Sequence, residues 1–193
     1  MTIGVLNWDK RRTWHWAMAL LALLSVGWIA MSRADQERQR GNASPVPLPR
    51  EGYLAPEWAL QTLDGEEVTL SGLRGQVVIL NFWATWCPPC RSEMPAVEEI
   101  HQTYRDQGLA VVAINVQQSE GQIQAFVDEM GLTFPVLPDR DGSVSKRYRV
   151  ASLPTAFVID RTGTIREIAV GGPLSRAYLA STVAPLLAEE GGE

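Results

Sequence analysis

Residues 81–95 read NFWATWCPPCRSEMP and contain the only two cysteines of the chain. The apolar run Val77 to Trp83, rich in β-branched and aromatic residues and too short for a helix, predicts a buried strand. The two prolines that follow suit the first turn of a helix, where their missing N–H groups would have no intrahelical partner. Cys87 is therefore predicted where a strand ends and a helix begins.

That position favours redox chemistry at Cys87. The helix N-terminus places partial positive charge beside the sulfur and stabilises the thiolate, so Cys87 is the candidate nucleophile. Cys90 lies one turn further on, close enough for a reversible disulfide, and is the candidate resolving thiol. A purely structural disulfide is the alternative, although so small a loop would stabilise a domain little. A zinc site needs three or four ligands, and two cysteines with His15 and His101 do not suggest one. We expect no metal and no cofactor.

Residues 82–95 resemble the thioredoxin superfamily and, within it, the TlpA/ResA-like membrane-anchored thiol–disulfide oxidoreductases, which carry a redoxin or AhpC/TSA-like domain. The resemblance covers about residues 50–190. It implies an α/β, thioredoxin-like fold: a central mixed β-sheet flanked by helices, with an N-terminal β-hairpin, a mid-domain insert and one preceding transmembrane helix.

The chain is expected to divide into a short cytoplasmic N-terminus (1–13), a transmembrane anchor (14–31), a flexible Pro-rich linker (32–54) and the thioredoxin-like domain (55–190). Residues 14–31 carry no formal charge apart from a titratable histidine, and as a helix they would span about 27 Å. A cleaved signal peptide is the alternative, with a weak cleavage site at 32–34.

The distribution of charged residues indicates how the chain is oriented in the membrane and which partners the domain suits. The basic triplet at residues 10–12 abuts the expected span, which favours a cytoplasmic N-terminus and a domain on the extracytoplasmic side, in the periplasm or at the outer face of the cytoplasmic membrane. Residues 50–193 hold eleven Lys and Arg against nineteen Asp and Glu. Such an acidic domain argues against nucleic acid as a partner.

The resemblance also implies roles for residues around the dithiol. Plain thioredoxins have a buried Asp where this chain has Asn81, and in the TlpA/ResA-like group the corresponding acid resembles Glu93, a proton acceptor for Cys90. The alternative for Glu93 is an acid placed near the helix start by the dipole. Pro154 matches the proline held cis opposite the dithiol, with Leu153 presenting its backbone to a substrate peptide. We also expect substrate contacts from the motif residues Trp86, Pro88 and Pro89.

The function expected is a membrane-tethered disulfide reductase for exported proteins, for which the family suggests cytochrome c biogenesis or a copper-site protein. A membrane electron donor of the thiol-reducing type would supply the electrons. Pro88 and Pro89 remove two N–H groups from the loop, so the Cys87 pKa is expected nearer to that of thioredoxin than to that of the oxidant DsbA.

Two other functions stay open. A peroxiredoxin-like thiol peroxidase with antioxidant activity would share the opening Ala55-Pro56-Glu57, but Leu80 and Ala84 stand where its Pro-x-x-x-Thr-x-x-Cys motif needs Pro and Thr. A non-catalytic thioredoxin-like module would use the groove at Pro154 to bind peptides.

Overall fold

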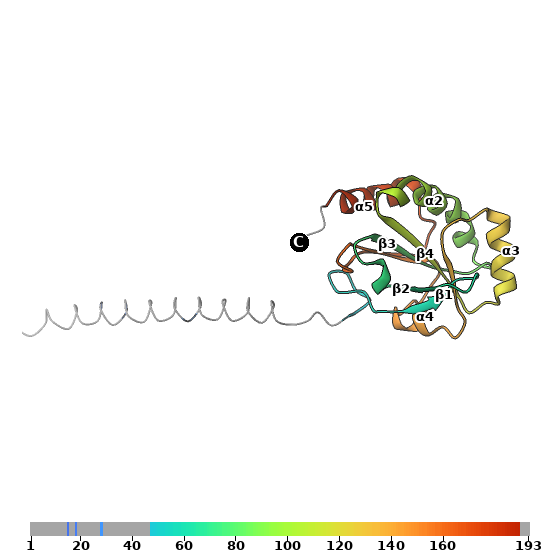
Figure 1. Ribbon diagram of the computed structural model, residues 1–193. Coiled ribbons are helices and arrows are strands. Elements are labelled where there is room, and N and C mark those ends of the chain that lie inside the picture. Colours follow the sequence, from blue (N-terminus) through green and yellow to red (C-terminus); the bar gives the residue numbers. More distant parts are fainter. Residues whose placement is uncertain (1–14, 16–17, 19–27, 29–46, 190–193) are drawn as a thin grey trace, which may run out of the picture. The chain divides into compact units, whose positions relative to one another are not determined.

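The computed structural model describes residues 15, 18, 28 and 47–189 (Figure 1). Most of the expected N-terminus, transmembrane anchor and linker therefore lies outside the described residues. Within the part that is described, no helix has the length and apolarity needed to cross a bilayer. The chain divides into the units Met1–Ser44 and Pro45–Glu193, and the second contains the fold described below.

A five-stranded mixed sheet forms the centre of the domain, in the order β5-β4-β3-β6-β7. Strands β3, β4 and β5 are parallel, whereas β6 is antiparallel to β3 and β7 to β6. The strands are β3 Val77–Trp83, β4 Leu109–Val116, β5 Val136–Asp139, β6 Thr155–Ile159 and β7 Ile165–Val170. Every residue of β3 is buried, as its run of residues that are apolar apart from Asn81 predicts.

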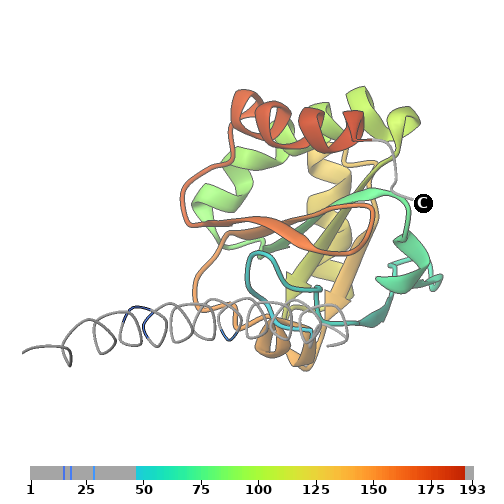
Figure 2. The ribbon, with the colours of Figure 1, turned by 90° about the vertical axis from the view of Figure 1, so that its left-hand side faces the viewer.

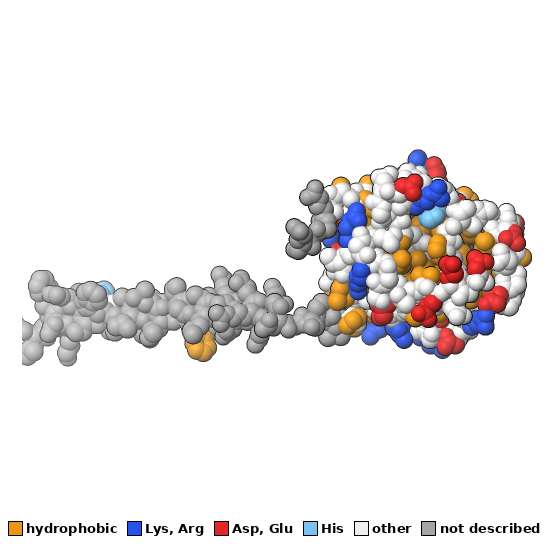
Figure 3. Space-filling model, viewed as in Figure 1, with side chains coloured by type: hydrophobic (Ala, Val, Ile, Leu, Met, Phe, Trp, Pro, Cys, Tyr) orange, Lys and Arg blue, Asp and Glu red, His pale blue; other side chains and the backbone are white. Residues whose placement is uncertain are grey.

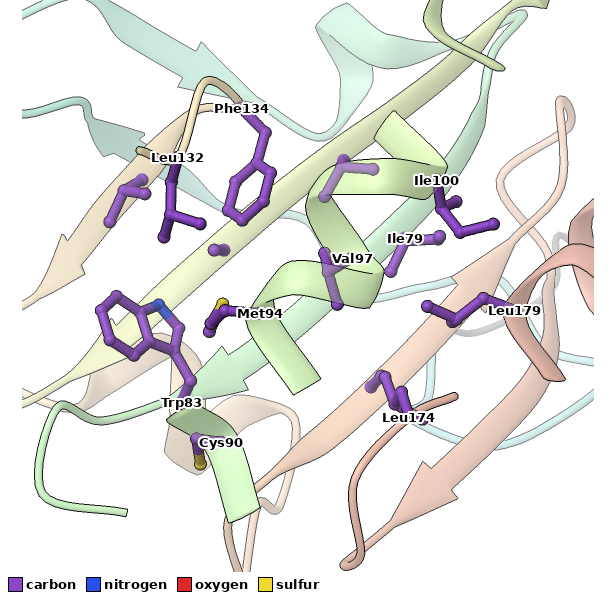
Figure 4. Packing of buried hydrophobic residues seen from close by; sticks show 14 of the residues in the cluster. Ile79, Trp83, Cys90, Met94, Val97, Ile100, Leu132, Phe134, Leu174 and Leu179 are labelled. Atoms are coloured by element: carbon purple, nitrogen blue, oxygen red, sulfur yellow. The ribbon is translucent and has the colours of Figure 1, made fainter. Parts of the chain in front are cut away.

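Side chains alternate between the two faces of this sheet, and each face has its own core. On β3, Ile79 and Trp83 pack toward α2, whereas Leu80 and Phe82 pack on the opposite face. The first core is covered by the helices α2 Pro88–Tyr104, α3 Glu120–Met130 and α5 Arg176–Ala188. Figure 2 shows α5 and α2 along one side of the sheet, and Figure 4 shows side chains of α2 packed between the helix and the strands.

The second face is covered by α4 Ser143–Arg147 and by the segment around an N-terminal hairpin. The hairpin strands β1 Ala59–Gln61 and β2 Glu67–Thr69 form a separate antiparallel pair. Short 3₁₀ helices follow at Ser71–Leu73 and Arg105–Gln107. The segment expected to include the insert, residues 117–150, builds α3, β5 and α4. The mixed sheet with flanking helices is thioredoxin-like, as expected.

The folded domain begins earlier than residue 55, so the end of the expected linker is corrected. Residues 47–54 lie against the edge strand β7, where the Gly52 N–H donates to the Ile165 carbonyl at 2.8 Å and the Ile165 N–H to the Tyr53 carbonyl at 2.9 Å. Leu54 forms an isolated bridge with Thr164. An edge strand offers unpaired backbone groups, and this segment uses them.

Tyr148 fastens the start of the domain to the end of α4. Its ring is buried against Phe82 and Phe157, and its hydroxyl donates to the Pro56 carbonyl at 2.6 Å. Burial raises the pKa of Tyr148, so the phenol stays protonated and remains a donor.

We expect Tyr148→Phe to lower the free energy of unfolding by about 1–2 kcal/mol, because it leaves a buried carbonyl without its donor. Urea unfolding followed by circular dichroism measures this change. Tyr53→Phe, at an exposed tyrosine, is the control and should stay within about 0.5 kcal/mol of the parent. Equal stability of the two variants would show that the Tyr148 hydrogen bond contributes nothing.

Candidate active site

Cys87 is the N-cap residue of α2, at the junction expected from the sequence. It forms a disulfide with Cys90, whose Cα atom lies 5.2 Å away. The Cys90 N–H also lies 3.3 Å from the Cys87 sulfur and donates to it. Pro88 and Pro89 occupy the first two helical positions and contribute no N–H. Cys87 is 3% exposed and Cys90 0%, so both residues are buried in the oxidised form.

A segment distant in sequence lies at the same edge of the sheet as the dithiol. The register Phe82↔Thr155 places the start of β6 at the same edge of the sheet as the end of β3. The Leu153–Pro154 bond just before β6 is cis, and the Pro154 carbonyl accepts a hydrogen bond from Gly171 N–H at 2.8 Å. Leu153 is half-buried against both cores. The structure thus brings Leu153 and Pro154 to the edge that carries Cys87.

The exposed surface beside the dithiol is apolar. Trp86 is 67% exposed, Pro88 is exposed, and Pro89 is half-buried. A large aromatic ring kept in water next to a buried sulfur is a surface suited to contact a polypeptide.

Glu93 is a buried carboxyl group on α2, one helical turn after Cys90. It is 0% exposed, and its two oxygens accept hydrogen bonds from Asn81 Nδ2 at 2.9 Å and from Leu174 N–H at 3.1 Å. Burial raises its pKa from 4.5 to about 7, although both donors act in the opposite direction. Glu93 lies beyond the first turn of α2, so the alternative of an acid favoured there by the helix dipole does not describe it.

Two contacts of the site were not anticipated from the sequence. One is the Leu174 N–H on Glu93, which comes from the loop between β7 and α5. The other is Gln118, whose side chain bonds Thr85 just before the dithiol. Polar side chains just after a parallel strand were the available signal for Gln118, because such strand ends meet at one edge of a sheet. In the described part of the chain, no three His, Cys, Asp or Glu side chains cluster as metal ligands would.

The chain is similar in sequence and fold to known redox proteins. The family model described as "AhpC/TSA family" matches residues 52–168. The chain is 48% identical over 125 residues to "Thioredoxin-like protein YneN" of Bacillus subtilis, covering 63% of this chain and 72% of that one. It is 36% identical over 166 residues to "Thiol-disulfide oxidoreductase ResA" of Halalkalibacterium halodurans, covering 85% and 90%.

A solved structure shares the fold at a TM-score of 0.62 and 28% identity, covering 67% of this chain and 96% of the other. That protein is described as a secreted disulfide oxidoreductase of Mycobacterium tuberculosis homologous to DsbE of E. coli.

The raised pKa of Glu93 predicts a pH-dependent stability. Because the folded state holds this proton more tightly than the unfolded state, Glu93 stabilises the fold below pH 4.5, and that stabilisation is lost as the pH rises toward 7. Glu93→Gln cannot ionise. Its free energy of unfolding, relative to the parent, should rise by about 3 kcal/mol between pH 4.5 and pH 8.

Chemical denaturation of the oxidised protein across this pH range measures the difference. Glu66→Gln, in the exposed hairpin turn, is the control, and its difference from the parent should stay within about 0.5 kcal/mol at every pH. A Glu93→Gln curve parallel to that of the parent would show that Glu93 titrates as an ordinary acid.

Proposed function

Because this chain belongs to the AhpC/TSA family, among the TlpA/ResA-like thiol–disulfide oxidoreductases of the thioredoxin superfamily, we propose that it reduces disulfides of exported proteins. The observation that carries the proposal is the Cys87–Cys90 disulfide at the start of α2, with the buried Glu93 carboxyl one turn further on. The reduced dithiol supplies two electrons to a substrate disulfide.

In the first step, the Cys87 thiolate attacks one sulfur of the substrate disulfide. A bond forms between Cys87 and that sulfur, and the other substrate sulfur leaves as a thiolate that takes a proton from water. The helix start and the Cys90 N–H favour the attacking anion. The exposed Trp86 and the cis Leu153–Pro154 segment are proposed to hold the substrate chain in an extended conformation.

In the second step, Cys90 attacks the Cys87 sulfur and releases the second substrate thiolate, which leaves the Cys87–Cys90 disulfide. Cys90 must lose a proton, and Glu93 is the proposed acceptor. A carboxyl with a pKa of about 7 can take up and return a proton at neutral pH, whereas Asn81, in the strand below, does not titrate.

The direction of electron flow follows from the stability of the thiolate. The prolines at the first two helical positions leave the Cys90 N–H as the loop donor to the Cys87 sulfur. A disulfide whose reduced form has a thiolate with few donors is a weaker oxidant than the disulfide of DsbA, so the protein is proposed to work as a reductant.

We expect a reduction potential well below the roughly −120 mV of DsbA, because the reduced form has little extra stabilisation here. Equilibration of the purified protein with glutathione or dithiothreitol buffers, read by thiol alkylation, gives this number. A potential close to that of DsbA would make the protein an oxidant and overturn the proposed direction.

The membrane setting is also a proposal. Residues 14–31 would anchor the domain as a single span or signal-anchor, with the domain on the extracytoplasmic side. The similarity to a secreted disulfide oxidoreductase supports this compartment. There the partners would be disulfide-containing exported proteins, such as apocytochrome c or a copper-site protein, and a thiol-reducing membrane donor. The acidic side chains spread around α3 in Figure 3 do not suit nucleic acid.

A thiol peroxidase is the second candidate, because the matched family model carries the AhpC/TSA description. Leu80, buried inside β3, and Ala84, just after it, occupy the positions where a peroxidatic motif has Pro and Thr. Consumption of hydrogen peroxide by the purified protein, with dithiothreitol as reductant, separates this activity from disulfide reduction.

Substrate trapping tests the whole proposal. We expect Cys90→Ala, expressed in the native host, to accumulate mixed disulfides through Cys87 because the resolving step is removed. Non-reducing electrophoresis and mass spectrometry of the adducts identify the captured proteins. The double variant Cys87→Ser/Cys90→Ala is the matched control and should capture none. Adducts consisting of cytosolic proteins would refute the extracytoplasmic setting.

A further inference from the structure

We propose that Gln118 is a positioning residue for polypeptide substrates, because it fastens the turn that presents Trp86 beside Cys87. The inference rests on the proposed function, since it concerns how that dithiol meets a protein disulfide. Gln118 lies outside the dithiol motif, in the loop between β4 and α3.

The turn that Gln118 holds spans Ala84 to Cys87, and a hydrogen bond from the Cys87 N–H to the Ala84 carbonyl closes it at 3.2 Å. Thr85 and Trp86 are its two central residues. The Trp86 side chain is 67% exposed, so burial contributes little to fixing its direction. The position of the indole ring therefore depends on how firmly the backbone of the turn is held.

Gln118 holds this turn with both atoms of its amide. Its Oε1 accepts from the Thr85 N–H at 2.7 Å, and its Nε2 donates to Thr85 Oγ1 at 2.8 Å. Asn115 Nδ2 also donates to Gln118 Oε1, at 3.0 Å. Because two donors are directed at Oε1, the amide oxygen faces the Thr85 N–H and the amide nitrogen faces Thr85 Oγ1. The Gln118 amide thus fixes both the backbone and the side chain of Thr85.

The two hydrogen bonds between Gln118 and Thr85 are called the clamp below. Asn115 connects this clamp to the sheet. It is completely buried at the end of β4, where it is the register partner of Trp83, the last residue of β3. The Gln118 hydrogen bonds therefore join the exposed turn to β4, the strand next to β3 in the sheet.

The backbone on both sides of Gln118 is also fixed. Gln117 has a positive φ of 54°, which is uncommon for a residue with a side chain, and its N–H donates to the Asp139 carbonyl at 3.1 Å. Ser119 is the N-cap of α3 and forms a capping box with Gln122. The left-handed residue before Gln118 and the helix cap after it define the direction from which Gln118 reaches Thr85. The left-handed conformation of Gln117 costs free energy and persists because the surrounding contacts hold it.

The Cys87 sulfur, by contrast, is held from α2. The sulfur is bonded to the Cys90 sulfur and accepts a hydrogen bond from the Cys90 N–H. The Cys87 carbonyl accepts a hydrogen bond from the Arg91 N–H at 3.1 Å. Loss of the clamp should therefore weaken the docking of a polypeptide on Trp86 and leave the reactivity of the thiol unchanged. This separation distinguishes positioning from a general structural role.

The test uses Gln118→Met, which keeps an unbranched side chain of similar length and removes both hydrogen bonds to Thr85. With dithiothreitol as electron donor, we expect KM for insulin to rise roughly five- to tenfold and kcat to change less than twofold. The rate with the small disulfide DTNB and the pH profile of Cys87 alkylation should match those of the parent.

Two matched variants accompany it. Gln118→Glu keeps an acceptor for the Thr85 N–H and for Asn115 Nδ2, and should recover at least half of the lost kcat/KM. Gln124→Met changes an exposed glutamine of α3 whose amide bonds Asp128 on the surface, and should behave as the parent. If Gln118→Met does not fold, Thr85→Val, which removes the Oγ1 bond alone, should still raise KM about twofold.

In a double-mutant cycle, Trp86→Ala should abolish the effect of Gln118→Met on KM, because the clamp acts through that ring. An unchanged KM, an equal loss with insulin and DTNB, or additive effects with Trp86→Ala would overturn the inference. A parent protein that fails to reduce insulin would instead refute the proposed function, so the two failures are distinguishable.

Discussion

The site depends on the fixed end of strand β3. This strand is bonded on one side to β4 and on the other to β6, and every one of its residues is buried. Phe82 is paired with both neighbouring strands and Trp83, the last residue, with β4, so the turn into α2 starts from a rigid point. Because β6 is antiparallel to β3, the same ladder fixes Pro154 at the edge where Cys87 begins its helix.

At Glu93, beside β3, burial and hydrogen bonding shift the pKa in opposite directions. Two hydrogen bonds from neutral donors favour the carboxylate, but complete burial opposes it more strongly, and the pKa rises to about 7. Asn81 contributes one of those donors and no charge. A second carboxylate at residue 81 would repel the first, so a neutral amide in the strand suits an acid on the helix.

Local patterns predict correctly the elements that have a largely apolar run or strong signals for their ends. Strand β3 has the bounds Val77–Trp83 that the sequence indicates, since only Asn81 interrupts its apolar run. The prolines and the N-cap position of Cys87 fix the start of α2. The packing of residues 47–54 on β7 was not anticipated, because composition describes a proline-rich segment and not the free strand edge more than 100 residues away.

The contacts that sequence reasoning missed share a physical cause. Gln118 reaches Thr85 across 33 positions, and the Leu174 N–H reaches Glu93 across 81. Neither leaves a periodic signal, because a single polar side chain or backbone amide in a loop is locally unremarkable. The tertiary arrangement alone shows that they meet at one edge of the sheet.

These contacts belong to one arrangement in which separate loops are each fixed to the site by one or two hydrogen bonds. Gln118 joins the β4–α3 loop to the turn before Cys87, Gly171 joins the end of β7 to Pro154, and Leu174 joins the next loop to Glu93. A reactive group is held in place by the residues that support it, and these are held most firmly when they lie on rigid elements. The loops around the Cys87–Cys90 disulfide obtain that support from the edge of the sheet to which they are bonded.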